Sequence, residues 1–175
     1  MQNNIRAIIG LGNPGHKYEN TRHNIGFKIL DALAQKFNVS FRIKDQMEIA
    51  QAEIDDTKVY LIKPQTYMND SGKVLPELLK KGIKPEEILV VHDELELPFG
   101  RANFKFGGSA KGHNGLKSII SVIGDKFHRF RFGIGRPQDR NEVPDYVLSN
   151  FSQQENVENL IEQNSKEIYE FVKLN

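Results

Sequence analysis

The sequence contains no cysteine. Thiolate nucleophiles, cysteine-ligated metal sites and disulfides are therefore excluded from its chemistry. No apolar run approaches the roughly 20 residues needed to cross a bilayer, and the N-terminus lacks the apolar core of a signal peptide. Internal repeats and low-complexity tracts are missing as well. At 175 residues the chain is expected to form one domain, residues 1–175, located in the cytoplasm.

Several catalytic signatures are also missing. There is no Gly-x-Ser-x-Gly turn, which argues against the serine hydrolases of that class, and the five histidines include no His-Glu-x-x-His pair. Gly107 and Gly112 have the spacing of a phosphate-binding loop, but His113-Asn114 stands where Lys-Ser or Lys-Thr is required. We expect no cofactor and no metal. The triplet His92-Asp93-Glu94 could supply metal ligands and remains the minor alternative.

Apolar patterning predicts an α/β fold. Strands are expected at Ile5–Ile9, Glu48–Ile54, Val59–Lys63, Ile88–His92, Ala102–Phe106 and Phe130–Ile134, and helices at Phe27–Phe37, Gly72–Lys81, Leu116–Ile123 and Gln153–Leu174. Ser152 and Glu155 have the spacing of a capping box for the last helix, and Pro76 implies a kink or a late start in the second. The alternation of strands and helices favours a twisted, mixed but mostly parallel sheet flanked by helices.

Long polar loops follow several of the predicted strands. The first covers residues 10–24, and three others cover residues 63–72, 92–98 and 107–115. The carboxyl ends of parallel strands meet at one rim of a sheet, where α/β proteins bind their ligands. We therefore expect these four loops to surround a single crevice.

Gly10, Gly12 and Gly15 reproduce the glycine spacing of a dinucleotide-binding loop. In that motif the third glycine opens a helix whose N-terminus binds the pyrophosphate. Here Pro14 and a polar run separate the glycines from the helix, and the acidic residue at the expected distance, Asp31, falls inside the helical pattern. A dinucleotide-dependent oxidoreductase is therefore kept only as an alternative hypothesis.

A strongly basic segment runs from Arg101 to Arg136. It holds eight lysines and arginines and one acidic residue, so it carries a net charge of +7 while the rest of the chain carries −6. Five phenylalanines are interleaved with these charges. Such a segment favours a polyanionic partner, either a nucleic acid or a multiply phosphorylated ligand. A non-catalytic RNA-binding module is thus the second alternative.

His23 is the strongest candidate for a catalytic base, because a neutral imidazole accepts a proton near physiological pH. A carboxylate bonded to one ring nitrogen would fix the tautomer and raise the basicity, and Asp93, which follows the most apolar strand, suits this role. Asn13, Asn69 and Asn114 each lie in a loop that follows a strand. Alone, each fits a turn. Together their amides would suit an acyl or amide substrate, and one could stabilise an oxyanion.

Five spaced motifs resemble those of the bacterial-type peptidyl-tRNA hydrolase family, in the same order between about Ile5 and Asn150. They are Gly10-Leu11-Gly12-Asn13-Pro14-Gly15 with Tyr18 and Thr21-Arg22-His23-Asn24, then Tyr67-Met68-Asn69-Asp70-Ser71-Gly72, His92-Asp93-Glu94-Leu95-Glu96-Leu97-Pro98, Gly112-His113-Asn114-Gly115-Leu116, and Phe130-Arg131-Phe132-Gly133-Ile134-Gly135-Arg136-Pro137. The resemblance implies hydrolysis of the ester that joins a peptide to the 3′ end of tRNA, without a cofactor.

The resemblance also implies roles for the matching residues. His23 corresponds to the base that activates water, Asp93 to its orienting carboxylate, and Asn13 to a residue that helps distinguish peptidyl-tRNA from free aminoacyl-tRNA. The positions that match the substrate channel are Tyr18, Tyr67, Met68, Asn69 and Asn114.

Lys105 and Arg131 match the basic residues that clamp the tRNA phosphate, which agrees with the charge asymmetry of the chain. Asn103 stands where some relatives carry a second basic clamp residue, which predicts weaker phosphate binding at that position. The implied partner is the acceptor stem and 3′ end of peptidyl-tRNA, and the implied state is a monomer.

Overall fold

The computed structural model describes residues 4–174, which contain one seven-stranded sheet in the order β2-β3-β4-β1-β5-β7-β6. Its strands are β1 (Ala7–Gly10), β2 (Arg42–Lys44), β3 (Met47–Ile54), β4 (Thr57–Pro64), β5 (Ile88–Glu94), β6 (Ala102–Phe106) and β7 (His128–Gly133). The four central strands β4, β1, β5 and β7 are parallel, and the outer pairs β2·β3, β3·β4 and β6·β7 are antiparallel. The predicted mixed, mostly parallel sheet is confirmed.

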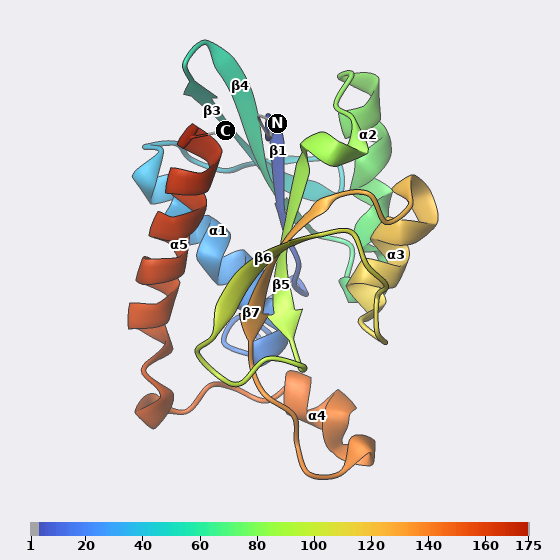
Figure 1. Cartoon of the computed structure of the whole chain (residues 1–175), viewed down its shortest axis with the longest axis vertical. Coiled ribbons are helices and arrows are strands. Elements are labelled where there is room, and N and C mark those ends of the chain that lie inside the picture. Colours follow the sequence, from blue (N-terminus) through green and yellow to red (C-terminus); the bar gives the residue numbers. More distant parts are fainter. Residues whose placement is uncertain (1–3, 175) are drawn as a thin grey trace.

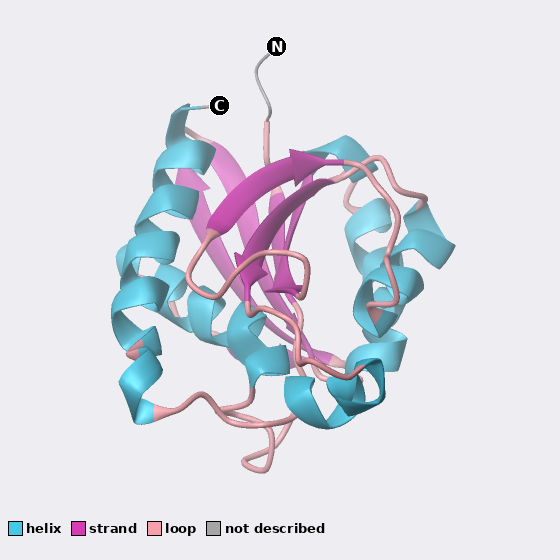
Figure 2. Ribbon diagram, turned by 60° about the horizontal axis from the view of Figure 1, so that its bottom comes forward, coloured by secondary structure: helices cyan, strands magenta, loops and turns pink. Residues whose placement is uncertain are grey.

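Helices cover both faces of this sheet (Figures 1 and 2). They are α1 (Ile25–Lys36) and α5 (Val157–Leu174) on one face and α2 (Leu75–Lys80) and α3 (Asn114–Ile123) on the other, with α4 (Val143–Val147) at the end of the sheet toward which β5 runs. Side chains alternate between the faces. Ile8 packs in the cluster with α1 and α5, whereas Ala7 and Ile9 pack with α2 and α3.

The six predicted strands and two of the four predicted helices lie within two residues of observed elements. The helix predicted at Gly72–Lys81 instead begins at Leu75, after the 3₁₀ turn Met68–Val74. Pro76 lies in its first turn, where the missing N–H costs no hydrogen bond, so the late start is confirmed.

The last helix also begins later than the predicted Gln153. Glu155 accepts the backbone N–H of Ser152 at 2.7 Å, but it caps the short 3₁₀ turn Gln153–Glu155. Asn156 then adopts the left-handed conformation, with φ 49°, and α5 starts only after it. The capping box is therefore present but belongs to a different turn. The elements β2 and α4 were not predicted, because three and five residues are too few to show a period.

The N-terminus of α1 lies directly against the sheet, closer than a side chain would allow. A Cβ on Gly26 would lie 2.5 Å from the carbonyl oxygen of Val91, and one on Gly10 would lie 2.4 Å from the carbonyl oxygen of Gly26. These glycines therefore serve the packing of α1 against β1 and β5, not a dinucleotide. The close approach brings His23, which precedes α1, to the end of β5.

Between residues 4 and 174, none of the helices combines the length and the apolar character that crossing a membrane requires.

Candidate active site

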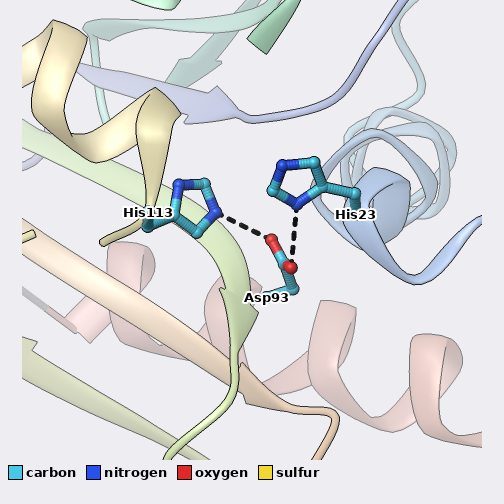
Figure 3. A group of neighbouring side chains, drawn as sticks. All are labelled: His23, Asp93 and His113. Carbon is cyan, nitrogen blue, oxygen red and sulfur yellow. Dashed lines mark hydrogen bonds and ion pairs between the residues drawn. The ribbon is translucent and has the colours of Figure 1, made fainter. Parts of the chain in front are cut away.

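His23 and Asp93, seventy residues apart in the sequence, are joined by a hydrogen bond (Figure 3). His23 Nδ1 lies 2.9 Å from Asp93 Oδ2, and His113 Nε2 lies 2.8 Å from Oδ1 of the same carboxylate. His23 belongs to the 3₁₀ turn Arg22–Asn24, Asp93 to β5, and His113 is the residue before α3. Three segments that are distant in sequence thus converge on one carboxylate.

The backbone of α3 determines which nitrogen of His113 carries the proton. His113 Nδ1 caps the helix by accepting the N–H of Leu116 at 3.3 Å. Neutral His113 therefore carries its proton on Nε2 and donates it to Asp93. The carboxylate also accepts the Nδ1–H of His23, whose second ring nitrogen, Nε2, points away from Asp93 (Figure 3). This arrangement leaves His23 Nε2 as the free basic atom of the site.

The electrostatics of the site keep Asp93 ionised and make His23 more basic. Burial alone would raise the pKa of Asp93, but the charges of His23 and His113 and the hydrogen bonds from both rings hold that pKa well below its usual range. Burial lowers the pKa of His23, yet the charge and hydrogen bond of Asp93 outweigh it, so the pKa of His23 is raised above 6.5. A perturbed pair of this kind is typical of functional sites.

Two cavities meet at His23. The first, of about 370 Å³, is bordered by Asp93 and His113 and by the basic residues Lys105, Lys111, Arg129, Arg131, Arg136 and Arg140. The second, of about 250 Å³, is bordered by Asn13, Tyr67, Met68, Asn69, Asn114 and Leu148. His23, Asn114, Pro144 and Val147 line both cavities. The predicted base therefore lies between a basic cavity and an amide-lined one.

Asn13 is held in one orientation by backbone groups. Its Oδ1 accepts the N–H of Met68 at 2.7 Å, and its own backbone N–H and carbonyl bind the Asn24 amide at 2.9 and 2.8 Å. Only the oxygen of an amide accepts from an N–H, so Nδ2 of Asn13 is left as a donor, with no partner among the described residues. Asn13 can therefore donate to a carbonyl oxygen in the second cavity.

Tyr67 marks the mouth of the second cavity. Its φ of 62° and ψ of 159° lie in a region that residues with a side chain rarely adopt, and such strain is concentrated at functional sites. The exposed ring packs edge-to-face with Tyr18 at a centroid distance of 6.4 Å. Tyr18 lines neither of the two cavities itself, and it reaches the site through Tyr67.

The loop 107–113 reaches the site from the opposite end of the sheet. Because β6 is antiparallel to β7, it ends away from the rim where β1, β4 and β5 end, so this loop does not start at the shared rim. The expectation that four loops surround one crevice is nevertheless confirmed, since residues from all four border the two cavities that meet at His23. The chain returns along the sheet to the start of α3 (Figure 1). Arg129 in β7, only 2% exposed, donates to the carbonyl oxygens of Gly108 and Ser109. Arg129 therefore holds the loop through these hydrogen bonds. Because its side chain is buried, little of it is accessible to a polyanion.

Arg131 and Lys105 both border the first cavity, on the neighbouring strands β7 and β6. Arg131 Nε donates to Asn103 Oδ1 at 2.9 Å, and Nη1 donates to Glu94 Oε1 at 3.4 Å. Asn103, which stands at a position that the resemblance leads us to expect as basic, thus orients Arg131 instead of adding a charge.

Comparisons with known proteins show the family of this chain. A family model described as peptidyl-tRNA hydrolase matches residues 7–175. The chain belongs to the peptidyl-tRNA hydrolase family. The peptidyl-tRNA hydrolase of Rickettsia prowazekii (strain Madrid E) is 52% identical over 151 residues, 85% of this chain and 82% of the relative. That of Neisseria meningitidis serogroup B is 52% identical over 153 residues, 85% and 80% of the two chains.

A solved structure agrees with the family assignment. The crystal structure of peptidyl-tRNA hydrolase from Acinetobacter baumannii matches with a TM-score of 0.92 at 37% identity, over 99% of this chain and 91% of that chain. The family resemblance read from the motifs is confirmed, and the oxidoreductase alternative finds no support.

One group in the site has donor atoms close enough together to hold a metal ion. Within residues 4–174, ligand atoms of His23, Asp93 and His113 lie within 4.8 Å of one another. Of the triplet His92-Asp93-Glu94 that the sequence suggested as metal ligands, only Asp93 belongs to this group. His92 is buried, donates from Nδ1 to the carbonyl oxygen of Asp93 at 2.8 Å, and its pKa is lowered to about 3 by burial and by the charge of His113. His92 is therefore neutral at physiological pH.

His113 was not predicted as a site residue, although it lies in one of the family motifs. A histidine before a helix also fits a simple N-cap, and no spacing rule connects residues 23, 93 and 113. Pro144 and Val147 were missed because α4 itself was missed. The sequence does show that several histidines lie near predicted strand ends. Without the fold, this pattern cannot show that His113 contacts Asp93.

Proposed function

We propose that this member of the peptidyl-tRNA hydrolase family cleaves the ester between peptide and tRNA with His23 as general base. The observation that carries the proposal is the His23–Asp93 pair at the junction of a basic and an amide-lined cavity. The substrate has the same division, since the ester lies between a phosphate-rich strand and a chain of amides. Each side of the bond thus meets groups of complementary chemistry.

In this mechanism His23 Nε2 takes a proton from water as the water oxygen attacks the ester carbonyl, a role that contributes about 10²–10⁴ to the rate. The tetrahedral intermediate collapses by breaking the bond from carbon to the ribose oxygen. The imidazolium returns its proton to that oxygen, and the peptide leaves as a carboxylic acid that releases the second proton of the water to solvent. Asp93 stabilises the imidazolium and keeps Nε2 free to accept.

The amide groups would bind the peptide side of the ester. Asn13 offers Nδ2 as a donor, and Asn69 and Asn114 are exposed in the same cavity. A donor placed near the carbonyl oxygen stabilises the negative charge that develops there. We assign the peptide to the second cavity and the acceptor stem to the first. We further propose that residues 1–175 act as one domain, as a monomer and in the cytoplasm.

The direct test is release of an N-acetylated aminoacyl group from tRNA, measured with and without a chelator. We expect multiple turnovers that the chelator leaves unchanged, because the mechanism routes no step through a metal. An RNA-binding module would retard tRNA in a gel but leave the ester intact even in excess protein. An oxidoreductase would instead show saturable binding of a dinucleotide.

Lys105→Ala and Arg131→Ala should weaken tRNA binding and flatten its salt dependence. Each lost phosphate contact is expected to reduce the slope of log affinity against log salt by about 1. Turnover at saturating substrate should change little, because neither residue contacts His23. Lys126→Ala is the matched control, since Lys126 is exposed in the same basic segment but outside the cavity. Parent slopes in both cavity variants would contradict the assignment.

A further inference from the structure

Arg22, the residue before His23, is bound by a segment of chain more than 120 residues away. Its Nη1 donates to Ser149 Oγ at 2.7 Å, to the Asn150 carbonyl at 2.6 Å and to the Ser149 carbonyl at 3.3 Å. Its Nη2 forms an ion pair with Glu155 Oε1 at 2.8 Å. One guanidinium therefore joins the catalytic turn to residues 149–155.

Aromatic and backbone contacts reinforce this connection. The guanidinium lies over the ring of Tyr146 at 4.8 Å and that of Phe151 at 5.4 Å. The backbone N–H of Arg22 donates to the Ser149 carbonyl at 3.0 Å, and a β-bridge pairs Thr21 with Asn150. The side chain is mostly shielded, with 12% of its surface exposed, so these charged hydrogen bonds are only weakly screened.

The segment that Arg22 binds continues directly from α4, which borders the reaction site. Pro144 and Val147 of α4 line both cavities, and Leu148 lines the second. On its other side α4 is tied to the end of β7, because the Tyr146 hydroxyl donates to the carbonyl oxygen of Ile134. Through the Tyr146 ring and Ser149, Arg22 thus connects α4 and the residues that follow it to the turn that carries the base.

We infer that Arg22 is a positioning residue that fixes α4 relative to His23 and so sets the fit of peptidyl-tRNA in both cavities. The inference rests on the proposed function. Arginine suits this role because its planar group donates in several directions while its face stacks on rings, which a lysine cannot do. The pKa of His23 is shifted by its burial and by Asp93. Loss of Arg22 should therefore leave unchanged the pH below which kcat/KM falls.

The test compares Arg22→Lys, Arg22→Gln and Ser149→Ala with Lys36→Gln. The last variant breaks the Lys36–Glu162 pair, which joins α1 to α5 away from the cavities. We expect the Arg22 variants to raise KM for peptidyl-tRNA about tenfold and Ser149→Ala about threefold, with kcat within about threefold of the parent. Amide hydrogen exchange should accelerate in residues 143–150 but not in β5. Lys36→Gln should change none of these.

The inference is overturned if exchange in residues 143–150 is unchanged, or if kcat falls while KM stays at the parent value. The latter result would place Arg22 at the reaction centre. If the Arg22 variants do not fold, Ser149→Ala decides alone, and parent KM and exchange in that variant refute the inference. The exchange measurement needs no turnover, so it separates failure of this inference from failure of the proposed activity, which the unsubstituted chain tests.

Discussion

His23→Ala should lower the turnover of N-acetylated aminoacyl-tRNA by about 10²–10⁴-fold, the contribution of a general base. The protein should remain folded, because the side-chain hydrogen bond of His23 is to Asp93, and Asp93 keeps its bond to His113. Binding of tRNA should also persist, since the basic cavity is unchanged. Single-turnover rates, thermal melting and gel retardation of tRNA measure the three expectations separately.

His16→Ala is the matched control for this experiment. His16 lies in the same loop, but its side chain is almost fully exposed and contacts Glu19. The control should retain parent turnover. Hydrolysis at the parent rate by His23→Ala would remove His23 from the mechanism, whereas loss of both turnover and melting cooperativity would indicate a structural role.

Asp93→Asn should reduce turnover by about 10⁴-fold, the size of the same exchange in a Ser-His-Asp triad. The reason is the fixed tautomer of His113. Because the Leu116 N–H occupies His113 Nδ1, His113 must still donate from Nε2, and the new amide can accept that bond only with its oxygen. Its NH₂ group then faces His23 Nδ1 and forces the proton onto Nε2, which can no longer accept.

The same variant should shift the pH profile of kcat/KM. In the parent, activity requires neutral His23, so it rises with pH through a pKa that Asp93 raises above 6.5. Without the carboxylate, burial lowers that pKa unopposed, so the acid limb should move to lower pH while the plateau falls. Asp93→Ala is the comparison variant. Although asparagine is nearly isosteric with aspartate, we expect kcat/KM of Asp93→Asn to be no higher than that of Asp93→Ala. An unmoved acid limb would show that another group titrates.

The parts of the fold that the sequence predicts are those with a strong local pattern. The apolar run of β5 and the alternation of β3 identify strands, and the apolar stripe of α5 identifies a helix. The elements β2 and α4 carry no such pattern because they are too short. Their placement depends on pairing with β3 and on the contacts of Arg22, which lie outside any local window.

The candidate site follows the same division. His23 and Asp93 could be predicted because His23 lies in the loop after β1 and Asp93 lies near the end of β5. A parallel sheet brings the ends of such strands to one rim. His113 arrives from the antiparallel β6 by a return loop, so the rim rule cannot place it. Likewise, a count of the basic residues between Arg101 and Arg136 cannot show that Arg129 is buried and bound to two loop carbonyls. Patterns along the chain report periodicity, whereas these contacts depend on the direction of each strand.

The close approach at Gly26 has a further consequence. A Cβ at Gly26 would lie within 2.6 Å of main-chain atoms of Leu11 and Val91, so no side chain fits between the start of α1 and these two residues, and His23 lies just before this contact. Adding even one methyl group at Gly26 would move the whole helix outward and carry the imidazole with it.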